Sequence, residues 1–509
     1  MVTPPYPSYL VSMLRPLLLV LATWTLLAAP RVAAQDPGFT AMAFNVENVF
    51  DADRKSPYDD FPVDGTGLDV WSPEELARKL GAVAEVIKSV DGGKGPDVLV
   101  LNEVEVDQTP ESTVDVDAFL AAHRGKDYRR LLRSDMSEEL RGVPAEAWIA
   151  KALEDSGLAG YRMILGEVAP GSNESIRNVI LTRLPVRSTR QHKIEGARAI
   201  VEARLDAGGR VVTVFANHWK SGAGSATAER TRLQNAHVLR TRINELLAED
   251  PQSEILVAGD LNSHHDQDRR YPYLIETGIN DILGAQGDPW RLRAKGGADL
   301  YNLWYDLEPS RRRSDCFRGE WGTLMHLIIS RGLADGHGVE YVAGSFRSVE
   351  IPGLNAHPIT GLPWELTRVG PGAGVSDHFP VVARFRILPA GAPDAGNPLR
   401  RPLREVEGGL PCFPELDRAS LRSAEIVNAL DTASLAKAVG EPFRLRGEWG
   451  GSRMTVRIGD QVFPVYAGDT NLAAGLKSLP AGTKVDWIGL LAVHKGRLQF
   501  VIETPAWLR

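Results

Sequence analysis

Polar residues that could hydrolyse a phosphoester stand at the ends of several apolar runs in this chain. Carboxylates, amides and two imidazoles recur in five short motifs: FNVEN with Asn45 and Glu47, NEVE with Glu103, NHWKS with Asn217 and His218, GDLNS with Asp260 and Asn262, and SDHFP with Asp377 and His378. A metal-assisted attack of water on phosphorus needs these groups, because carboxylates hold the cation and a base takes a proton from water. Hard oxygen ligands favour Mg²⁺ or Mn²⁺.

Each motif alone has an ordinary structural explanation. A polar residue after a strand is commonly a cap or turn residue, so GDLN could be an Asx turn and SDH a plain loop. The order and spacing of all five endings are far less probable by chance. We therefore interpret them as parts of one site.

The segments next to the motifs have the pattern of buried strands. Apolar runs occur in PDVLVLNEVE, YRMILGEV, NVILTRLPV, RVVTVFANHWKS, SEILVAGDLNS, TLMHLIIS and HFPVVARFRI. Helical spacing covers 72–90, where Ser72 and Glu75 form a capping-box pattern, and 226–248, whose charged face we expect to be solvated. Rigid strands that deliver side chains to one rim are a common way to build an active site.

As a set, the motifs resemble the endonuclease/exonuclease/phosphatase superfamily, which includes deoxyribonuclease I, abasic-site endonucleases, secreted nucleases, sphingomyelinases and inositol polyphosphate 5-phosphatases. The resemblance covers residues 39–388. It implies an α/β fold, a four-layered sandwich of two packed β-sheets flanked by helices. The motifs identify the superfamily and not the substrate.

The resemblance implies a metal site. Glu103 would bind the catalytic metal, with Asn45 beside it, and Glu47 would serve a second metal or position the first. The cofactor would be Mg²⁺ or Mn²⁺. The sequence leaves open whether one or two metals bind.

It also implies the catalytic groups. His218 would donate to a phosphate oxygen, Asp260 and Asn262 would hold and activate the attacking water, and Asp377 with His378 would complete the acid/base group. Whether Asp260 or His378 takes the proton stays open at this point.

One position departs from the family pattern. In WGTLMHLIIS, Met325 stands where relatives usually have an Asp that accepts a hydrogen bond from the imidazole of the SDH motif. His378 therefore needs another acceptor, and Asp315 or a backbone carbonyl are candidates. A weakened or retired enzyme is the alternative.

Substrate contacts are suggested at several polar positions. Arg177 and Asn178 could touch a phosphate, although a solvent-facing strand edge would explain them equally well, and Asn217 and Lys220 could meet a phosphate of a chain. The basic run 311–313 could serve a polyanion or could be a solvated surface.

The first residues have the pattern of a secretory signal peptide. Arg15 precedes an apolar run over 16–29, and Arg31 and small residues up to Ala34 follow. We expect residues 1–34 to be removed and the protein to be periplasmic or secreted. An uncleaved anchor is the alternative, but the run is shorter than the roughly 20 residues that a span needs. Loss of the two arginines changes the net charge from -7 to -7 - 2 = -9.

A Pro- and Gly-rich stretch predicts a linker over 389–416, which divides a catalytic domain, 39–388, from a C-terminal domain, 417–509. The second domain alternates β-branched, aromatic and basic residues with turns, which suggests a small all-β barrel of the oligonucleotide/oligosaccharide-binding (OB) kind. Cys316 and Cys412 are the only cysteines. They could pair in an oxidising compartment, stay free or bond another molecule.

The C-terminal domain could contact single-stranded nucleic acid. Residues 437–509 contain ten basic and six acidic residues, a charge of +4, within an acidic chain. Aromatic residues could stack on bases, but most aromatics of so small a barrel would form its core, and the domain could only brace the enzyme. The four candidates are Trp449, Phe463, Tyr466 and Trp487.

Together these observations favour an exported, metal-dependent phosphodiesterase, a nuclease acting on extracellular DNA or RNA. A phosphatase or phospholipase-like diesterase acting on inositol phosphates or sphingomyelin-type headgroups is the second hypothesis. A binding protein that keeps the scaffold without turnover is the third.

Overall fold

The computed structural model describes residues 37–509 except 54, 57–70, 110–113, 169–173, 295–298, 367–372, 390–398, 400–408, 495 and 509. The expected signal peptide and most of the expected linker lie outside the described residues. By contacts, Gly38–Arg509 form one unit. Within the described residues, no helix combines the length and apolarity needed to cross a membrane.

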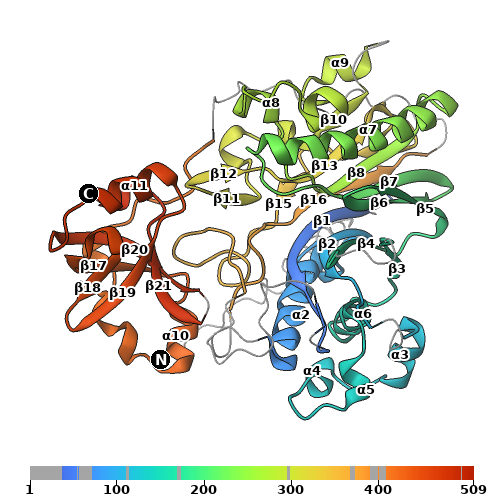
Figure 1. Ribbon diagram of the computed structural model, residues 1–509. Coiled ribbons are helices and arrows are strands. Elements are labelled where there is room, and N and C mark those ends of the chain that lie inside the picture. Colours follow the sequence, from blue (N-terminus) through green and yellow to red (C-terminus); the bar gives the residue numbers. More distant parts are fainter. Residues whose placement is uncertain are drawn as a thin grey trace, which may run out of the picture. The chain divides into compact units, whose positions relative to one another are not determined.

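Two seven-stranded sheets form the larger part of the structure (Figure 1). The first has the order β14 (Val339–Tyr341), β16 (Val381–Ile387), β1 (Gly38–Val49), β2 (Val98–Glu105), β4 (Ile176–Thr182) and β3 (Arg162–Leu165), with β15 (Arg347–Ser348) also paired to β16. The second has the order β5 (Val186–Ile194), β6 (Ala197–Ala207), β7 (Arg210–His218), β8 (Glu254–Asp260), β13 (Met325–Ser330), β10 (Leu300–Asn302) and β9 (Ala285–Gln286).

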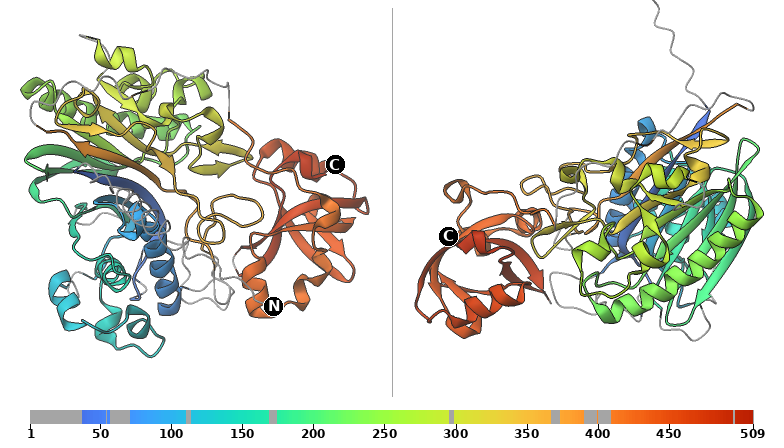
Figure 2. Two further views of the ribbon diagram at one scale, coloured as in Figure 1. Left: turned by 180° about the vertical axis from the view of Figure 1, so that it is seen from behind. Right: turned by 90° about the horizontal axis from the view of Figure 1, so that it is seen from above.

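The sheets pack face to face because alternate strand residues are apolar on both faces. In β1, Phe39, Ala41 and Ala43 lie in the core between the sheets, whereas Met42 and Phe44 belong to the core beneath the helices. Helices α2 (Pro73–Lys88) and α6 (Ala145–Asp155) share that outer core, and α7 (Ala226–Glu249) covers the outer face of the second sheet. These layers, visible in Figures 1 and 2, confirm the four-layered sandwich.

The two long helices begin where their capping residues predict. The Ser72 hydroxyl accepts the Glu75 N–H at 3.1 Å, and Ser225 caps α7. Shorter helices are α3 (Val116–Ala122), α4 (Tyr128–Leu131), α5 (Glu138–Arg141), α8 (Gln267–Arg270) and α9 (Pro289–Arg293).

The expectation of a solvated charged face on α7 was wrong at Arg232, which is fully buried. Its guanidinium bonds Glu229 at 2.6 Å and the carbonyls of Lys220, Gly222 and Ala223 at 2.8 to 3.0 Å. A buried charge is tolerated only when it is paired and hydrogen-bonded. Arg232 therefore holds the loop that follows β7.

Parallel pairing brings the polar strand ends to one edge. Strands β1 and β2 are parallel with Asn45 opposite Asn102, and β7 and β8 are parallel with His218 opposite Asp260. The carboxyl ends of all four strands therefore meet, which places the motifs within reach of one another.

The C-terminal domain is a closed five-stranded barrel in the order β17 (Pro442–Trp449), β18 (Thr455–Ile458), β19 (Gln461–Tyr466), β21 (Arg497–Val501) and β20 (Lys484–His494). Helices α10 (Thr432–Ala438) and α11 (Thr470–Ser478) accompany it. Of the four aromatics considered for stacking, Trp449, Phe463 and Trp487 lie in the barrel core, and only Tyr466 is exposed, at 55%.

A disulfide joins Cys316, in the hairpin β11 (Asp315–Phe317) and β12 (Glu320–Gly322), to Cys412. The Cα atoms are 6.0 Å apart, an ordinary separation for a disulfide. Backbone bonds from Trp321 to Leu410 and from Cys412 to Gly319 accompany it. The segment that precedes the barrel is thus attached to the sandwich.

Candidate active site

The motif residues converge on one carboxylate oxygen, Asp260 Oδ2. Asn45 Nδ2 donates to it at 3.0 Å and to Glu103 Oε1 at 2.9 Å. The Nε2 atoms of His218 and His378 lie 3.9 and 3.7 Å from it, and His218 Nε2 lies 3.7 Å from Glu103 Oε1. The five motifs that contribute these residues span more than three hundred positions in the sequence, from Asn45 to His378, yet their side chains meet within a few ångströms.

The backbone at this edge takes unusual conformations. Glu47, Glu103 and Asn262 have φ values of 49°, 66° and 47°, in the left-handed region that non-glycine residues seldom adopt. Such conformations cluster at functional sites because the surroundings must hold them in place. At Gly259 a Cβ would lie 2.0 Å from the Asn217 carbonyl oxygen, so only glycine lets β7 and β8 approach this closely.

Burial makes the negative charges here costly. It raises the pKa of Glu103 to about 7, and the nearby charge of Asp377 adds to the effect. Burial also raises the pKa of Asp260. The carboxylates are therefore crowded in a place where each one disfavours ionisation of the others.

The two imidazoles have opposite electrostatic environments. Burial lowers the pKa of His218 well below its usual value, and the positive charge of Arg198 lowers it further. Burial also opposes the charged form of His378, but the carboxylates of Asp377, Asp260 and Asp315 together outweigh it and raise that pKa well above the usual value. The surroundings thus favour the neutral form of His218 and the charged form of His378.

The three expected metal ligands, Glu103, Asn45 and Glu47, differ in exposure and in what their side chains contact. The Glu103 side chain is 18% exposed, so it can be reached from solvent, whereas Asn45 directs its N–H donors and not its oxygen toward the two carboxylates. Glu47 Oε2 is buried without a hydrogen bond, 4.0 Å from Lys79 Nζ. In the described residues, no three His, Cys, Asp or Glu side chains are arranged as a complete protein cage for a metal.

An Mg²⁺ site does not require such a cage. Mg²⁺ keeps several waters and is usually held by one or two carboxylates together with the phosphates of a substrate. Glu103 and the neighbouring Asp260 are two such carboxylates. Asn45 donates an N–H to each of them, and a bound cation would balance the same negative charge. The donor set therefore fits a hydrated hard cation.

His378 has a hydrogen-bond partner even though Met325 replaces the expected Asp. Its Nδ1 lies 2.6 Å from Oδ1 of the adjacent Asp377, and its backbone N–H donates to the Ser376 hydroxyl. Asp315 faces it across an isolated β-bridge, and Asp315 Oδ2 has no hydrogen bond in the described structure. Met325 itself is fully buried in the core between the sheets.

The predicted substrate contacts are mostly occupied within the protein. Arg177 pairs with Glu146 at 2.7 Å, and Asn178 is buried and bonds Asn102 and the Ala199 carbonyl. The Asn217 amide bonds the Phe215 carbonyl and the Trp219 indole.

Lys220 is exposed next to His218. In the basic run 311–313, Arg312 is buried and bonds the Leu307 carbonyl, and Arg313 pairs with Glu350 at 2.5 Å. Asn262, in turn, donates its amide N–H to the Trp219 carbonyl and its backbone N–H to Asp260 Oδ1.

Sequence reasoning missed Asn102, the buried amide that connects the two sheets beneath the site. Its Oδ1 accepts the Asp260 N–H at 2.9 Å, and its Nδ2 donates to Asn178 Oδ1 at 2.7 Å and to the Asn217 carbonyl at 2.9 Å. The available signal was a lone amide in an apolar strand, directly before Glu103. Ser376 acts in a similar way, because its hydroxyl donates to the Asn45 carbonyl at 2.7 Å.

Residues 186–386 match the model of the Endonuclease/Exonuclease/phosphatase family. The match covers β5 to β16 and includes His218, Asp260 and His378. No curated protein matches the chain.

Solved structures were also compared with the chain. TDP2 from Caenorhabditis elegans is 14% identical, with 69% of this chain and 74% of that chain covered and a TM-score of 0.37. The human Nocturnin catalytic domain is 15% identical, with 69% and 96% covered and a TM-score of 0.35. A family protein from Bacteroides thetaiotaomicron is 11% identical, with 70% and 96% covered and a TM-score of 0.37.

Asn102→Ala should destabilise the sandwich and disorder its site. It leaves the Asp260 N–H and two further buried groups without partners, so we expect a loss of about 3 kcal/mol in the free energy of unfolding and at least about tenfold in turnover. Asn235→Ala is the control, because that fully buried amide has no hydrogen-bond partner among the described residues. Urea unfolding of both variants checks this, and equal losses would contradict the role of Asn102.

Met325→Asp should lower the stability of the sandwich and should not improve the hydrogen bonding of His378. A carboxylate in the apolar core costs about 3 kcal/mol or more, and His378 already pairs with Asp377. Met325→Leu should cost less than about 1.5 kcal/mol. Thermal unfolding and turnover of both variants check this. A stable Met325→Asp variant with higher turnover would show that His378 lacks an adequate partner.

Proposed function

We propose that this protein is an exported, Mg²⁺-dependent phosphodiesterase, a nuclease that hydrolyses extracellular DNA or RNA. The observation that carries the proposal is the placement of Glu103, His218 and His378 around Asp260 Oδ2, with three of these four residues inside the stretch that matches the family model. Mn²⁺ is an alternative cation with the same ligand preference.

The arrangement supports an in-line attack by water. Asp260 Oδ2 would accept the proton of the attacking water, since Asn45 and the Asn262 N–H hold this carboxylate in place. Bound at Glu103, Mg²⁺ would neutralise charge on the phosphate. No covalent enzyme intermediate is needed.

The two imidazoles would stabilise the negative charge that develops at phosphorus. His218, whose neutral form is favoured, would donate one N–H to a non-bridging oxygen, and His378, whose charged form is favoured, would direct its Nε2 N–H toward the same space. The raised pKa of His378 supports the assignment of Asp260 as the base, since a protonated His378 could not accept the proton.

Positive side chains next to His218 support a polyanionic substrate. Lys220 and Arg198 both contribute positive charge at His218, and Arg198 also bonds the Trp219 carbonyl. Arg232 fixes the loop that carries Lys220. A phosphate next to the scissile one could contact this pair of cations.

Two independent features support export. The pattern of residues 1–34 is that of a signal peptide, and the pairing of Cys316 with Cys412 is typical of an oxidising compartment.

The substrate panel is the direct test. Mature protein with Mg²⁺ should hydrolyse single- or double-stranded DNA or RNA, and Glu103→Gln and His218→Ala should each lower turnover by about a hundredfold or more. Glu195→Gln and His237→Ala change exposed residues of the same types and should leave turnover unchanged.

The panel includes bis(p-nitrophenyl) phosphate, inositol phosphates and sphingomyelin, assayed alongside the nucleic acids. Turnover of a headgroup substrate without turnover of any nucleic acid would replace the nuclease proposal by the second hypothesis. Unchanged turnover in both Glu103→Gln and His218→Ala would show that the activity does not come from this site.

A further inference from the structure

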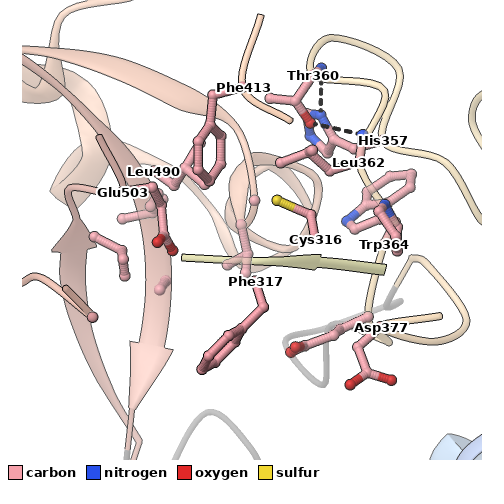
Figure 3. A pocket seen from close by; sticks show the side chains of 18 of the residues that line it. Cys316, Phe317, His357, Thr360, Leu362, Trp364, Asp377, Phe413, Leu490 and Glu503 are labelled. Atoms are coloured by element: carbon pink, nitrogen blue, oxygen red, sulfur yellow. Dashed lines mark hydrogen bonds between the residues drawn. The ribbon is translucent and has the colours of Figure 1, made fainter. Parts of the chain in front are cut away.

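A cavity of about 490 Å³ extends from Asp377 of the site to the surface of the barrel. It is lined by the hairpin residues 316–318, by the segment 357–366 and by barrel residues that include Tyr466 and Glu503. Figure 3 shows His357 and Trp364 side by side on one wall, with Phe413, Leu490 and Glu503 across from them. Because Asp377 lines the cavity, a molecule bound in it would be adjacent to the reacting centre.

Two buried N–H donors on this wall have no partner in the described structure. His357 and Trp364 are 3% and 9% exposed, and neither His357 Nε2 nor Trp364 Nε1 makes a hydrogen bond there. His357 Nδ1 accepts the N–H groups of Ile359 and Thr360, so the proton is on Nε2. Buried donors are rarely left unsatisfied, so this pair indicates an acceptor that binds between them.

Gly440 keeps the space in front of the donors open. A Cβ at this position would lie 3.3 Å from Trp364 Nε1 and 3.7 Å from His357 Nε2, and its φ of 88° favours glycine. One oxygen atom of a ligand could therefore approach both donors at this point.

The other walls fit a flat aromatic ring. Phe317 and Tyr466 are 66% and 55% exposed, whereas the remaining barrel aromatics considered for stacking are buried. Exposed rings on a cavity wall are suited to stacking on bases. The Arg318 guanidinium, 5.0 Å from the Phe317 ring centroid, adds a further planar group.

The charges favour a base over a phosphate in this cavity. Three carboxylates line it, from Glu365, Asp377 and Glu503, against the single cation Arg318 among the described lining residues. Carboxylates repel a phosphate but accept hydrogen bonds from exocyclic amino groups and ring N–H groups. A heterocycle with both carbonyl and N–H groups matches this set of donors and acceptors.

We propose that the cavity binds a nucleobase of a single-stranded substrate next to the scissile phosphate, with its carbonyl oxygen between His357 and Trp364 and its ring on Phe317 or Tyr466. The proposal rests on the proposed nuclease function. It assigns the barrel a part in substrate binding through Tyr466 and Gly440, not through the aromatics in its core.

Binding of fluorescein-labelled single strands, measured by anisotropy in EDTA, separates this pocket from catalysis. We compare a DNA strand with one of the same length in which abasic spacers replace the central bases. The intact strand should bind at least about fivefold more tightly, because stacking on an aromatic is a substantial part of affinity. Trp364→Phe, which keeps the ring and loses the N–H, and Phe317→Ala should each remove most of this preference.

Trp290→Phe is the matched control, since Trp290 is 62% exposed and does not line the cavity, and it should keep the preference. Equal binding of intact and abasic strands by the wild-type protein would overturn the pocket and leave the nuclease proposal intact, provided that DNA is still cleaved with Mg²⁺. An unchanged preference in both Trp364→Phe and Phe317→Ala would also overturn it. Cleavage of bis(p-nitrophenyl) phosphate without binding or cleavage of any strand would overturn the pocket and the nuclease proposal together.

Discussion

The structure depends on how it holds three neighbouring carboxylates, the buried Asp260 and the partly exposed Glu103 and Asp377, at one edge of its sheets. Such charges repel strongly at low effective dielectric, and each loses hydration on burial. Asn45 balances two of them with its N–H groups, and His378 balances the third. The remaining negative charge is what supports the proposed binding of a cation at this edge of the sheets.

Buried hydrogen bonds keep these carboxylates close to one another. Asn102 fastens the carboxyl ends of strands from both sheets to one another, so the carboxylates cannot relax apart. Arg232, which lies in α7, fixes the loop after β7 through hydrogen bonds to three carbonyl groups of that loop. Preorganised groups of this kind stabilise a transition state because they need no reorientation during the reaction.

The sequence predicted the sandwich and the convergence of its motifs because buried strands and their polar ends leave a strong local pattern. It did not predict β5, where VRSTRQHKI lacks an apolar run because the strand lies at a sheet edge and is largely exposed. The sequence also did not predict the hydrogen-bond and ion-pair partners of the buried polar residues. Arg177 and Asn178 were candidates for substrate contacts, yet their side chains bond Glu146 and Asn102, which are distant in the sequence. The Asn217 amide bonds groups two residues before and after it.

The pairing of His378 with the adjacent Asp377 could not be inferred either. It depends on side-chain rotamers and on the isolated β-bridge between Asp315 and His378. Likewise, composition alone could not separate Tyr466 from the three core aromatics of the barrel. The specific roles of the site residues stay predictions until they are measured.

Mg²⁺ binding measured by isothermal titration calorimetry tests the central claim most directly, since the claim is that the carboxylate cluster requires a cation. The wild-type protein should bind Mg²⁺, and Glu103→Gln should weaken that binding by at least about tenfold, while Glu195→Gln should not. Wild-type affinity in the Glu103→Gln variant would contradict the account, because the carboxylate of Glu103 would then not be what holds the metal.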